Sequence, residues 1–172
     1  RGTCPERGGG GADRVRSLRS GENPHQAAAL YADGASAGGG VVRAPQRNPG
    51  AKALSYNNYN DADAALGLIR EFDAPAAAVI KHATPAGCAT AADLATAYDD
   101  ALATDPMSAF GGIVACNRRV GAATAERIVD SFKEVVVAPG YTDAGLDVLR
   151  GEKNLRVLAV DPDAAGAVDP LT

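Results

Sequence analysis

Apolar residues in this chain form short uninterrupted runs separated by segments of helical period. Three such runs lie at residues 76–80, 113–116 and 135–138, and each consists of small or β-branched residues without polar alternation. This pattern is typical of strands that are buried on both faces of a sheet. A last strand is predicted over residues 155–160.

Between the apolar runs the sequence predicts four helices. The first follows residue 58, with Asn60 or Asp61 as its cap and Asp73-Ala74-Pro75 at its end. A capping box, Thr90-x-x-Asp93, opens the second helix, and Thr142 opens the fourth. Each helix is expected to turn an apolar face toward the sheet. These faces are Ala62, Ala65, Leu66 and Ile69 in the first helix; Leu94, Ala97, Tyr98, Ala101 and Leu102 in the second; Ala125, Ile128, Val129 and Phe132 in the third; and Leu146 and Leu149 in the fourth.

Alternation of strands and helices predicts an α/β layer fold with a mainly parallel sheet, carried by residues 18–160. Residues 1–17 contain a glycine run and show no strand or helix period, so we expect a flexible arm or linker there. Residues 161–172 are rich in Asp, Ala, Gly and Pro and are expected to be a linker or tail. Residues 27–31 and 41–42 are expected to form a hairpin around the glycine-rich stretch 34–40.

Composition narrows the functional classes. The chain has 172 residues, 46% of them hydrophobic, which is enough for one domain with a core. A net charge of -4 argues against a nucleic-acid or membrane surface but allows a local basic pocket for one phosphate. The three cysteines lack metal-ligand spacing, and no apolar run approaches the length of a membrane span. We therefore expect a cytoplasmic protein with free thiols.

Lys81 and His82 stand side by side at the end of the first buried run, where Pro85 and Gly87 predict a loop. Ligand crevices of open α/β sheets lie outside the carboxyl ends of the strands, so both side chains are expected to face a pocket. The dipeptide alone favours a simpler interpretation, a lysine on a rim and a histidine bonded to a backbone carbonyl, because most histidines are not catalytic.

Six motifs occur in one order between about residues 18 and 160: RSGENPHQ at 19–26, LSYNN at 54–58, KHATPAG at 81–87, DPMSAFGG at 105–112, VVVAPGY at 135–141 and KNLRVL at 153–158. In this order they closely resemble the AICAR transformylase domain of the bifunctional purine-biosynthesis proteins, which join it to an IMP cyclohydrolase. The resemblance implies a cytidine-deaminase-like three-layer αβα sandwich, of which this chain is the first of two units. The zinc-deaminase motifs H-x-E and P-C-x-x-C are missing from the sequence, so no metal is predicted.

The reaction that the resemblance implies is formyl transfer from the co-substrate 10-formyltetrahydrofolate to the 5-amino group of AICAR, giving FAICAR. That amine is a poor nucleophile because its lone pair is delocalised into the imidazole ring, so a base must take its proton during attack. His82 is expected to be this base. Lys81 is expected to stabilise the developing oxyanion or to act as an acid.

The same resemblance implies a nucleotide site. Arg19 is expected to bind the phosphate through its planar guanidinium. Ser20 departs from the family, where tyrosine usually follows the arginine, and the lost aromatic area would weaken binding by about 1 kcal/mol. Asn58 should hydrogen-bond the nucleotide, Phe110 and Gly111 should border its base, and Glu134 could hold the ribose hydroxyls. Without the resemblance, Arg19 would be a solvated turn residue, Asn58 part of a turn, Phe110 core and Glu134 a strand-start charge.

Three interpretations stay open at this stage. The chain is an enzyme of purine biosynthesis or the first part of one, a catalytically silent nucleotide-binding module, or an assembly scaffold of the same fold. In the family the second unit supplies much of the folate pocket, and the resemblance implies a homodimer for the full-length protein. A chain of this length is therefore expected to bind the nucleotide weakly and to transfer no formyl group by itself.

Overall fold

The computed structural model of the chain describes residues 4–7, 12–32 and 40–160. Its centre is a five-stranded sheet with the strand order β4-β3-β5-β6-β7. The predicted tail at 161–172, the glycine run at 8–11 and most of the stretch 34–40 lie outside the described residues. The strands are β3 (Ala76–Lys81), β4 (Thr84–Thr90), β5 (Ile113–Cys116), β6 (Val135–Ala138) and β7 (Arg156–Ala159).

The α/β class is confirmed, and the sheet is mixed, with four of its five strands in one direction. β3 is antiparallel to both of its neighbours, β4 and β5, whereas β5, β6 and β7 pair in parallel, so β4 has the same direction as these three strands and β3 alone opposes them. The reason is the segment after Lys81, which forms a tight hairpin into β4 instead of the predicted loop. β4 was not predicted because its sequence, TPAGCAT, has neither an apolar run nor a regular alternation of apolar and polar residues.

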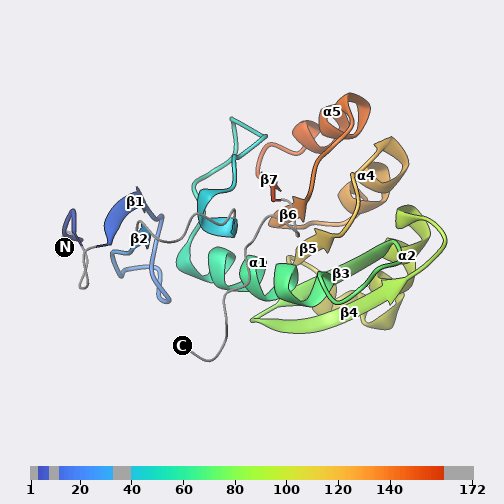
Figure 1. The fold of residues 1–172 in the computed structure, drawn as a ribbon, viewed down its shortest axis with the longest axis horizontal. Coiled ribbons are helices and arrows are strands. Elements are labelled where there is room, and N and C mark those ends of the chain that lie inside the picture. The colour runs from blue at the N-terminus through green and yellow to red at the C-terminus, as the bar shows by residue number, and fades with distance from the viewer. Residues whose placement is uncertain (1–3, 8–11, 33–39, 161–172) are drawn as a thin grey trace.

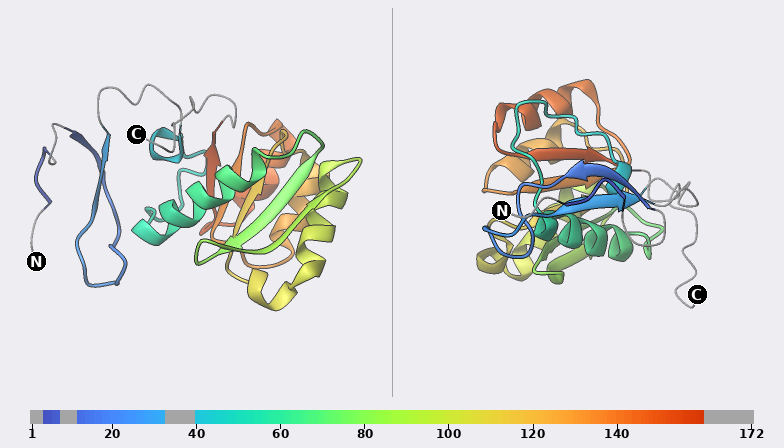
Figure 2. Two further views of the ribbon diagram at one scale, coloured as in Figure 1. Left: turned by 60° about the horizontal axis from the view of Figure 1, so that its bottom comes forward. Right: turned by 90° about the vertical axis from the view of Figure 1, so that its left-hand side faces the viewer.

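Helices cover both faces of this sheet, so the chain has three layers (Figures 1 and 2). On one face α1 (Tyr56–Ile69) packs on residues such as Ile80 and Ile113. On the other face lie α2 (Leu94–Thr104), α4 (Ala122–Val129) and α5 (Asp143–Gly151), which share a second core with Val79 and Val114. Successive strand residues contribute to opposite cores, as a strand buried on both faces requires.

Burial confirms the predicted inner faces of the first two helices, except that Leu102 is only partly buried, but the starts of both helices were placed wrongly. α1 begins after Ser55, whose side chain and that of Asn58 form a capping box, so Asn60 and Asp61 lie inside the helix. α2 is capped by Asp93 rather than by Thr90, which ends β4. Thr142 caps α5 as predicted.

Two further helical assignments differ from the sequence pattern. α4 ends at Val129, so Phe132 lies outside the helix and its side chain is 48% exposed. A four-residue helix, α3 (Pro106–Ala109), precedes the glycine pair and was not predicted. Its cap is Asp105, whose carboxylate accepts from the Ser108 N–H.

An antiparallel pair, β1 (Asp13–Ser17) with β2 (Ala29–Ala32), stands beside the layered part of the chain (Figure 1). The sequence showed no strand period before residue 18, and the predicted hairpin between residues 27–31 and 41–42 is also wrong. β2 pairs with β1, and Val41–Arg43 is a short 3-10 helix. Within the described ranges, none of the helices has the length and apolar character needed to cross a bilayer.

Gly87 of β4 gives a test of how closely α2 packs on the sheet. A Cβ atom at Gly87 would lie 1.9 Å from the carbonyl oxygen of Ala101, so Gly87→Ala should lower the free energy of unfolding by about 1–3 kcal/mol through overpacking. A Cβ atom at Gly67 in α1 would have no neighbour within 4 Å, and Gly67→Ala should raise stability by up to about 1 kcal/mol. Urea unfolding of the two variants measures both effects, and equal small changes would contradict the close packing.

Candidate active site

The predicted site residues gather at one edge of the sheet. Because β3 runs antiparallel to β5, its carboxyl end at Lys81 lies beside the amino ends of β5, β6 and β7. Glu134 immediately precedes β6, and Arg156 is the first residue of β7. We expected the site at the carboxyl ends of the strands, and among these four strands this is true of β3 alone. The parallel strands β5, β6 and β7 reach the same edge with their amino ends.

Lys81 and His82 line the same groove, which has a volume of about 400 Å³ and also includes Asp105 and Ser108. The Lys81 Nζ donates to the carbonyl oxygen of Phe110 at 2.8 Å, which holds the ammonium group at the sheet edge. His82 is exposed. The structure thus places both side chains on one concave surface, although a tight turn rather than a loop brings them there.

The turn between β3 and β4 has an unusual backbone. His82 and Ala83 have φ angles of 55° and 56°, both in the left-handed region. Two-residue hairpins of type I′ require this geometry and normally use Asn-Gly or a similar pair. A non-glycine residue in this region costs about 1–2 kcal/mol. Backbone strain of this kind is concentrated at functional sites, which directs attention to His82.

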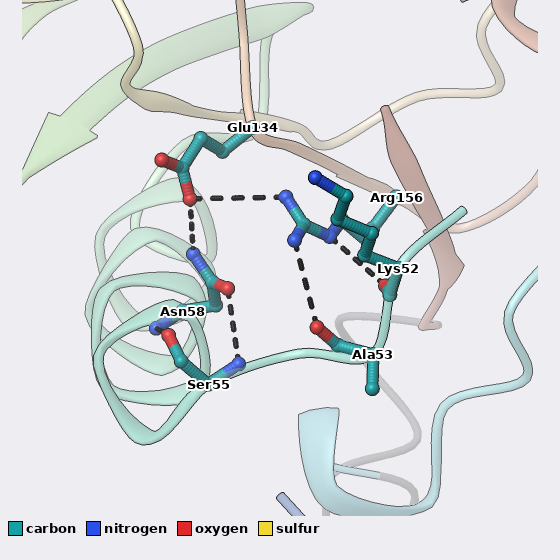
Figure 3. Close-up of polar contacts among 6 residues, drawn as sticks. All are labelled: Lys52, Ala53, Ser55, Asn58, Glu134 and Arg156. Atoms are coloured by element: carbon teal, nitrogen blue, oxygen red, sulfur yellow. Dashed lines mark hydrogen bonds and ion pairs between the residues drawn. The ribbon is translucent and has the colours of Figure 1, made fainter. Parts of the chain in front are cut away.

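A polar cluster joins α1 to the starts of β6 and β7 (Figure 3). The Asn58 Nδ2 donates to Glu134 Oε2 at 2.6 Å, and the Asn58 Oδ1 accepts from the Ser55 N–H at 3.1 Å. The same Glu134 oxygen lies 3.8 Å from Arg156 Nη1. Asn58 is buried, whereas the Glu134 side chain is 35% exposed, so the carboxylate can still reach a ligand.

Arg156 was missed by the sequence analysis. It is 4% exposed and donates to two backbone carbonyls, from Nε to Lys52 at 3.1 Å and from Nη2 to Ala53 at 3.5 Å. Burial lowers its pKa, the Glu134 carboxylate opposes that shift, and the positive charge of Arg19 adds to it. A lone cation inside the otherwise apolar strand 155–160 was the signal that could have revealed it.

Arg19 and Ser20 are attached to the start of α1 through their backbones. The Arg19 N–H donates to the Leu54 carbonyl at 3.0 Å, and the Ser20 carbonyl accepts from the Tyr56 N–H at 2.9 Å. Arg19 is exposed, close enough to Arg156 for their charges to interact. Ser20 is 9% exposed, so it lies in the protein rather than on an open surface.

Phe110 and Gly111 lie next to the Lys81 end of β3. Phe110 is 57% exposed, so the interpretation of this side chain as core is wrong, and its ring stacks at a tilt on Phe132 with centroids 5.6 Å apart. Gly111 has φ 73° and donates its N–H to the Phe132 carbonyl at 2.8 Å. A Cβ on the next residue, Gly112, would lie 2.9 Å from the Ile80 carbonyl oxygen, so this glycine allows β3 and β5 to meet.

The remaining candidates are structural or lie apart from this edge. His25 is exposed in the turn before β2. Cys116 is buried in the core, and burial raises its pKa to about 12; burial also raises the pKa of the partly buried Cys88. Both therefore act as small packing residues, as predicted. In the part of the chain that the structure describes, no three His, Cys, Asp or Glu side chains come together as metal ligands.

Comparison with known proteins identifies the family. The sequence model of the AICARFT/IMPCHase bienzyme matches residues 4–170. The chain belongs to the AICARFT/IMPCHase bienzyme family.

Curated members of the AICARFT/IMPCHase bienzyme family include the bifunctional purine biosynthesis protein PurH from three bacteria. The chain is 52% identical to that of Sorangium cellulosum (strain So ce56) over 147 residues, which are 86% of this chain and 28% of the relative. It is 53% identical to that of Acidithiobacillus ferrooxidans (strain ATCC 53993 / BNL-5-31) over 152 residues, 88% of this chain and 28% of the relative. The Bacillus subtilis (strain 168) protein is 46% identical over 153 residues, 89% of this chain and 30% of the relative. The chain thus spans less than a third of the length of these relatives.

Arg156 provides a test of the polar cluster. Arg156→Met removes two part-buried hydrogen bonds, to the carbonyls of Lys52 and Ala53, and the ion pair with Glu134, and should destabilise the chain by about 1–3 kcal/mol because bonds from a charged donor are lost. The matched control is Arg127→Met, which removes an ion pair to Asp99 whose side chains are 42% and 49% exposed, and which should leave the urea midpoint almost unchanged. Equal midpoints for the two variants would contradict a structural role for Arg156.

Proposed function

We propose that this chain carries the base and part of the nucleotide site of an AICAR transformylase, which transfers the formyl group of 10-formyltetrahydrofolate to the 5-amino group of AICAR and forms FAICAR. The observation that carries the proposal is the shared groove of Lys81 and His82 in a chain of the AICARFT/IMPCHase family. The folate co-substrate and the nucleotide are both small molecules, in keeping with a groove of this size.

In the proposed reaction the amine nitrogen of AICAR attacks the formyl carbon while His82 takes the amine proton. Lys81 has one of its three N–H groups on the Phe110 carbonyl, so the others are available to the oxyanion that forms on the formyl oxygen. This attack gives a tetrahedral intermediate. Its collapse breaks the bond between the formyl carbon and the folate nitrogen, and that nitrogen must gain a proton. The proton held by His82, or one from Lys81, completes the transfer.

The nucleotide is proposed to lie between Arg19 and the Phe110 side of the groove. Arg19 would bind the phosphate, supported by its exposure at the sheet edge, and Glu134 would accept from the ribose hydroxyls. Asn58 bonds Glu134, so its proposed contribution is to orient that carboxylate as well as to touch the ligand. Phe110 and Gly111 would border the base, and Ser20 would contribute less contact area than a tyrosine.

We further propose that residues 18–160 form the first cytidine-deaminase-like unit of the transformylase, with linkers on either side. The three layers and the mixed sheet support this proposal. Completion of the folate pocket by a second unit, and a homodimer in the full-length protein, are parts of the same proposal, as is a cytosolic location. The share of about 28% of the relatives' length is the reason to expect further pocket residues elsewhere.

A catalytically silent nucleotide-binding module is the second candidate function. Two observations favour it: Ser20 stands where the family usually has tyrosine, and the chain spans less than a third of its relatives. Calorimetry with AICAR together with a formyl-transfer assay separates the two candidates. A third possibility, a scaffold of the same fold, predicts that AICAR does not bind.

His82→Ala in the full-length protein should lower kcat for formyl transfer at least about a hundredfold, the usual effect of removing a general base. His25→Ala is the matched control, because His25 is the other histidine of this chain and lies in an exposed turn. The assay is the absorbance change as the formylated folate is consumed. A near-normal rate for His82→Ala would remove His82 from the proposed role.

Arg19→Ala should weaken AICAR binding about 10- to 100-fold, because a charge-assisted contact with the phosphate is lost. The corresponding nucleoside, which lacks the phosphate, should bind the variant and the original protein equally. Glu134→Gln should weaken both ligands, and Arg70→Ala, at the far end of α1, should weaken neither. Titration calorimetry measures the affinity of each variant for both ligands. An equal loss for nucleotide and nucleoside in Arg19→Ala would argue against a phosphate contact.

A further inference from the structure

The carboxylate of Asp61 holds the turn that carries His82. Its Oδ2 accepts from the His82 N–H at 3.2 Å, and its Oδ1 accepts from the Ala83 N–H at 2.7 Å. One side chain of α1 therefore uses both carboxylate oxygens on two successive amides of the β3–β4 turn. Nothing in the sequence pattern assigned Asp61 more than a possible cap of a helix.

This contact stabilises a turn whose backbone conformation is unfavourable for its residues. His82 and Ala83 both have positive φ, and neither is glycine, so the sequence itself does not favour this backbone. Lys81 pairs with Thr84 across the hairpin, which leaves the two amides between them without partners in the ladder. A carboxylate that accepts from both amides favours the left-handed conformation over alternatives in which the two N–H groups diverge.

Helix α1 gives Asp61 a fixed position. Its neighbours Ala62 and Ala65 are 0% exposed and pack the helix directly on the sheet. Asp61 lies three residues after Asn58, a spacing that places both on adjoining parts of one helix face. The same helix therefore bonds Glu134 through Asn58 and the His82 turn through Asp61.

We propose that Asp61 is a positioning residue for formyl transfer: by binding the His82 and Ala83 amides it fixes the backbone from which the His82 imidazole enters the groove. The inference rests on the proposed function of His82 as base. Asp61 acts through the turn and touches neither substrate. An electrostatic effect of the Asp61 charge on the imidazole would be a different mechanism. Rescue by Ala83→Gly indicates positioning, whereas a shifted acid limb of the pH–rate profile indicates the electrostatic effect.

The test uses the full-length protein with Asp61→Ala, Asp61→Asn and Ala83→Gly, and the double variant Asp61→Ala/Ala83→Gly. Asp61→Ala should lower kcat at least tenfold, with the KM for AICAR within twofold because Arg19 and Glu134 are untouched. Asp61→Asn keeps one acceptor oxygen and should lose less. Glycine adopts positive φ without strain, so Ala83→Gly should restore kcat at least threefold in the Asp61→Ala background, and the acid limb of the pH–rate profile should not move.

Asp63→Ala is the matched control, since Asp63 is an exposed residue of the same helix, and it should keep the original kcat. A kcat for Asp61→Ala within twofold of the original value overturns the proposal. A loss that Ala83→Gly does not restore also overturns it, and a shifted acid limb in that case assigns an electrostatic role instead. If Asp61→Ala does not fold, the comparison of Asp61→Asn with and without Ala83→Gly decides the question in the same way.

A second measurement is independent of activity. Amide hydrogen exchange at His82 and Ala83 should become at least tenfold faster in Asp61→Ala, and Asp63→Ala should leave it unchanged. Unchanged exchange in Asp61→Ala overturns the proposal whatever the kinetics show. If the original protein transfers no formyl group, the proposed function fails, while the exchange measurement still shows whether Asp61 holds the turn.

Discussion

Helix α1 packs against β3 and β5 through a stripe of alanine, leucine and isoleucine side chains that are almost wholly buried. The alanines allow the helix axis to approach the sheet closely, and close packing of this kind permits little sliding. Every contact between α1 and the candidate site depends on this packing of the helix on the sheet. Asn58 and Asp61 are useful only because the helix beneath them cannot shift relative to the strands.

The packing of α1 also explains why the candidate site residues occupy one sheet edge. The Ser55 cap starts the helix beside the segment that contains Arg19 and Ser20, and the first turn then passes the beginning of β6. Further along the helix comes the β3–β4 turn. Residues from four separate parts of the sequence are thereby aligned along one rigid element, which is how a modest domain can present an ordered polar surface.

The sequence predicted the features that depend on local pattern. β3, β5, β6 and β7 were identifiable because a strand buried on both faces needs an unbroken apolar run. β4 was not, because Pro85 and Gly87 are turn formers that become strand residues only through pairing with β3. The start of α1 was misplaced because several polar residues compete as caps, and the choice of Ser55 depends on its bonds with Asn58.

The same distinction applies to the site. The dipeptide Lys81-His82 drew attention as two titratable residues at a strand end, but the family motifs assigned it a role, as they did for Arg19, Asn58 and Glu134. Arg156 and Asp61 were not identified, because their roles come from partners far away in the chain: Arg156 binds a carbonyl 104 residues away, and Asp61 binds an amide 21 residues away. The lone cation in an apolar strand marks Arg156 as unusual, but the local sequence does not reveal which distant groups either residue binds.

The two-residue connection between β3 and β4 has a consequence for the order of events during folding. Hairpins with short connections form in about 1–10 μs, since little chain entropy is lost on closure. The bond from Asn58 to Glu134 closes a separation of 76 residues and must await assembly of the sheet. We therefore expect β3 and β4 to pair early, as a local event, and the bond from Asn58 to Glu134 to form only when the chain has completed its long-range pairing.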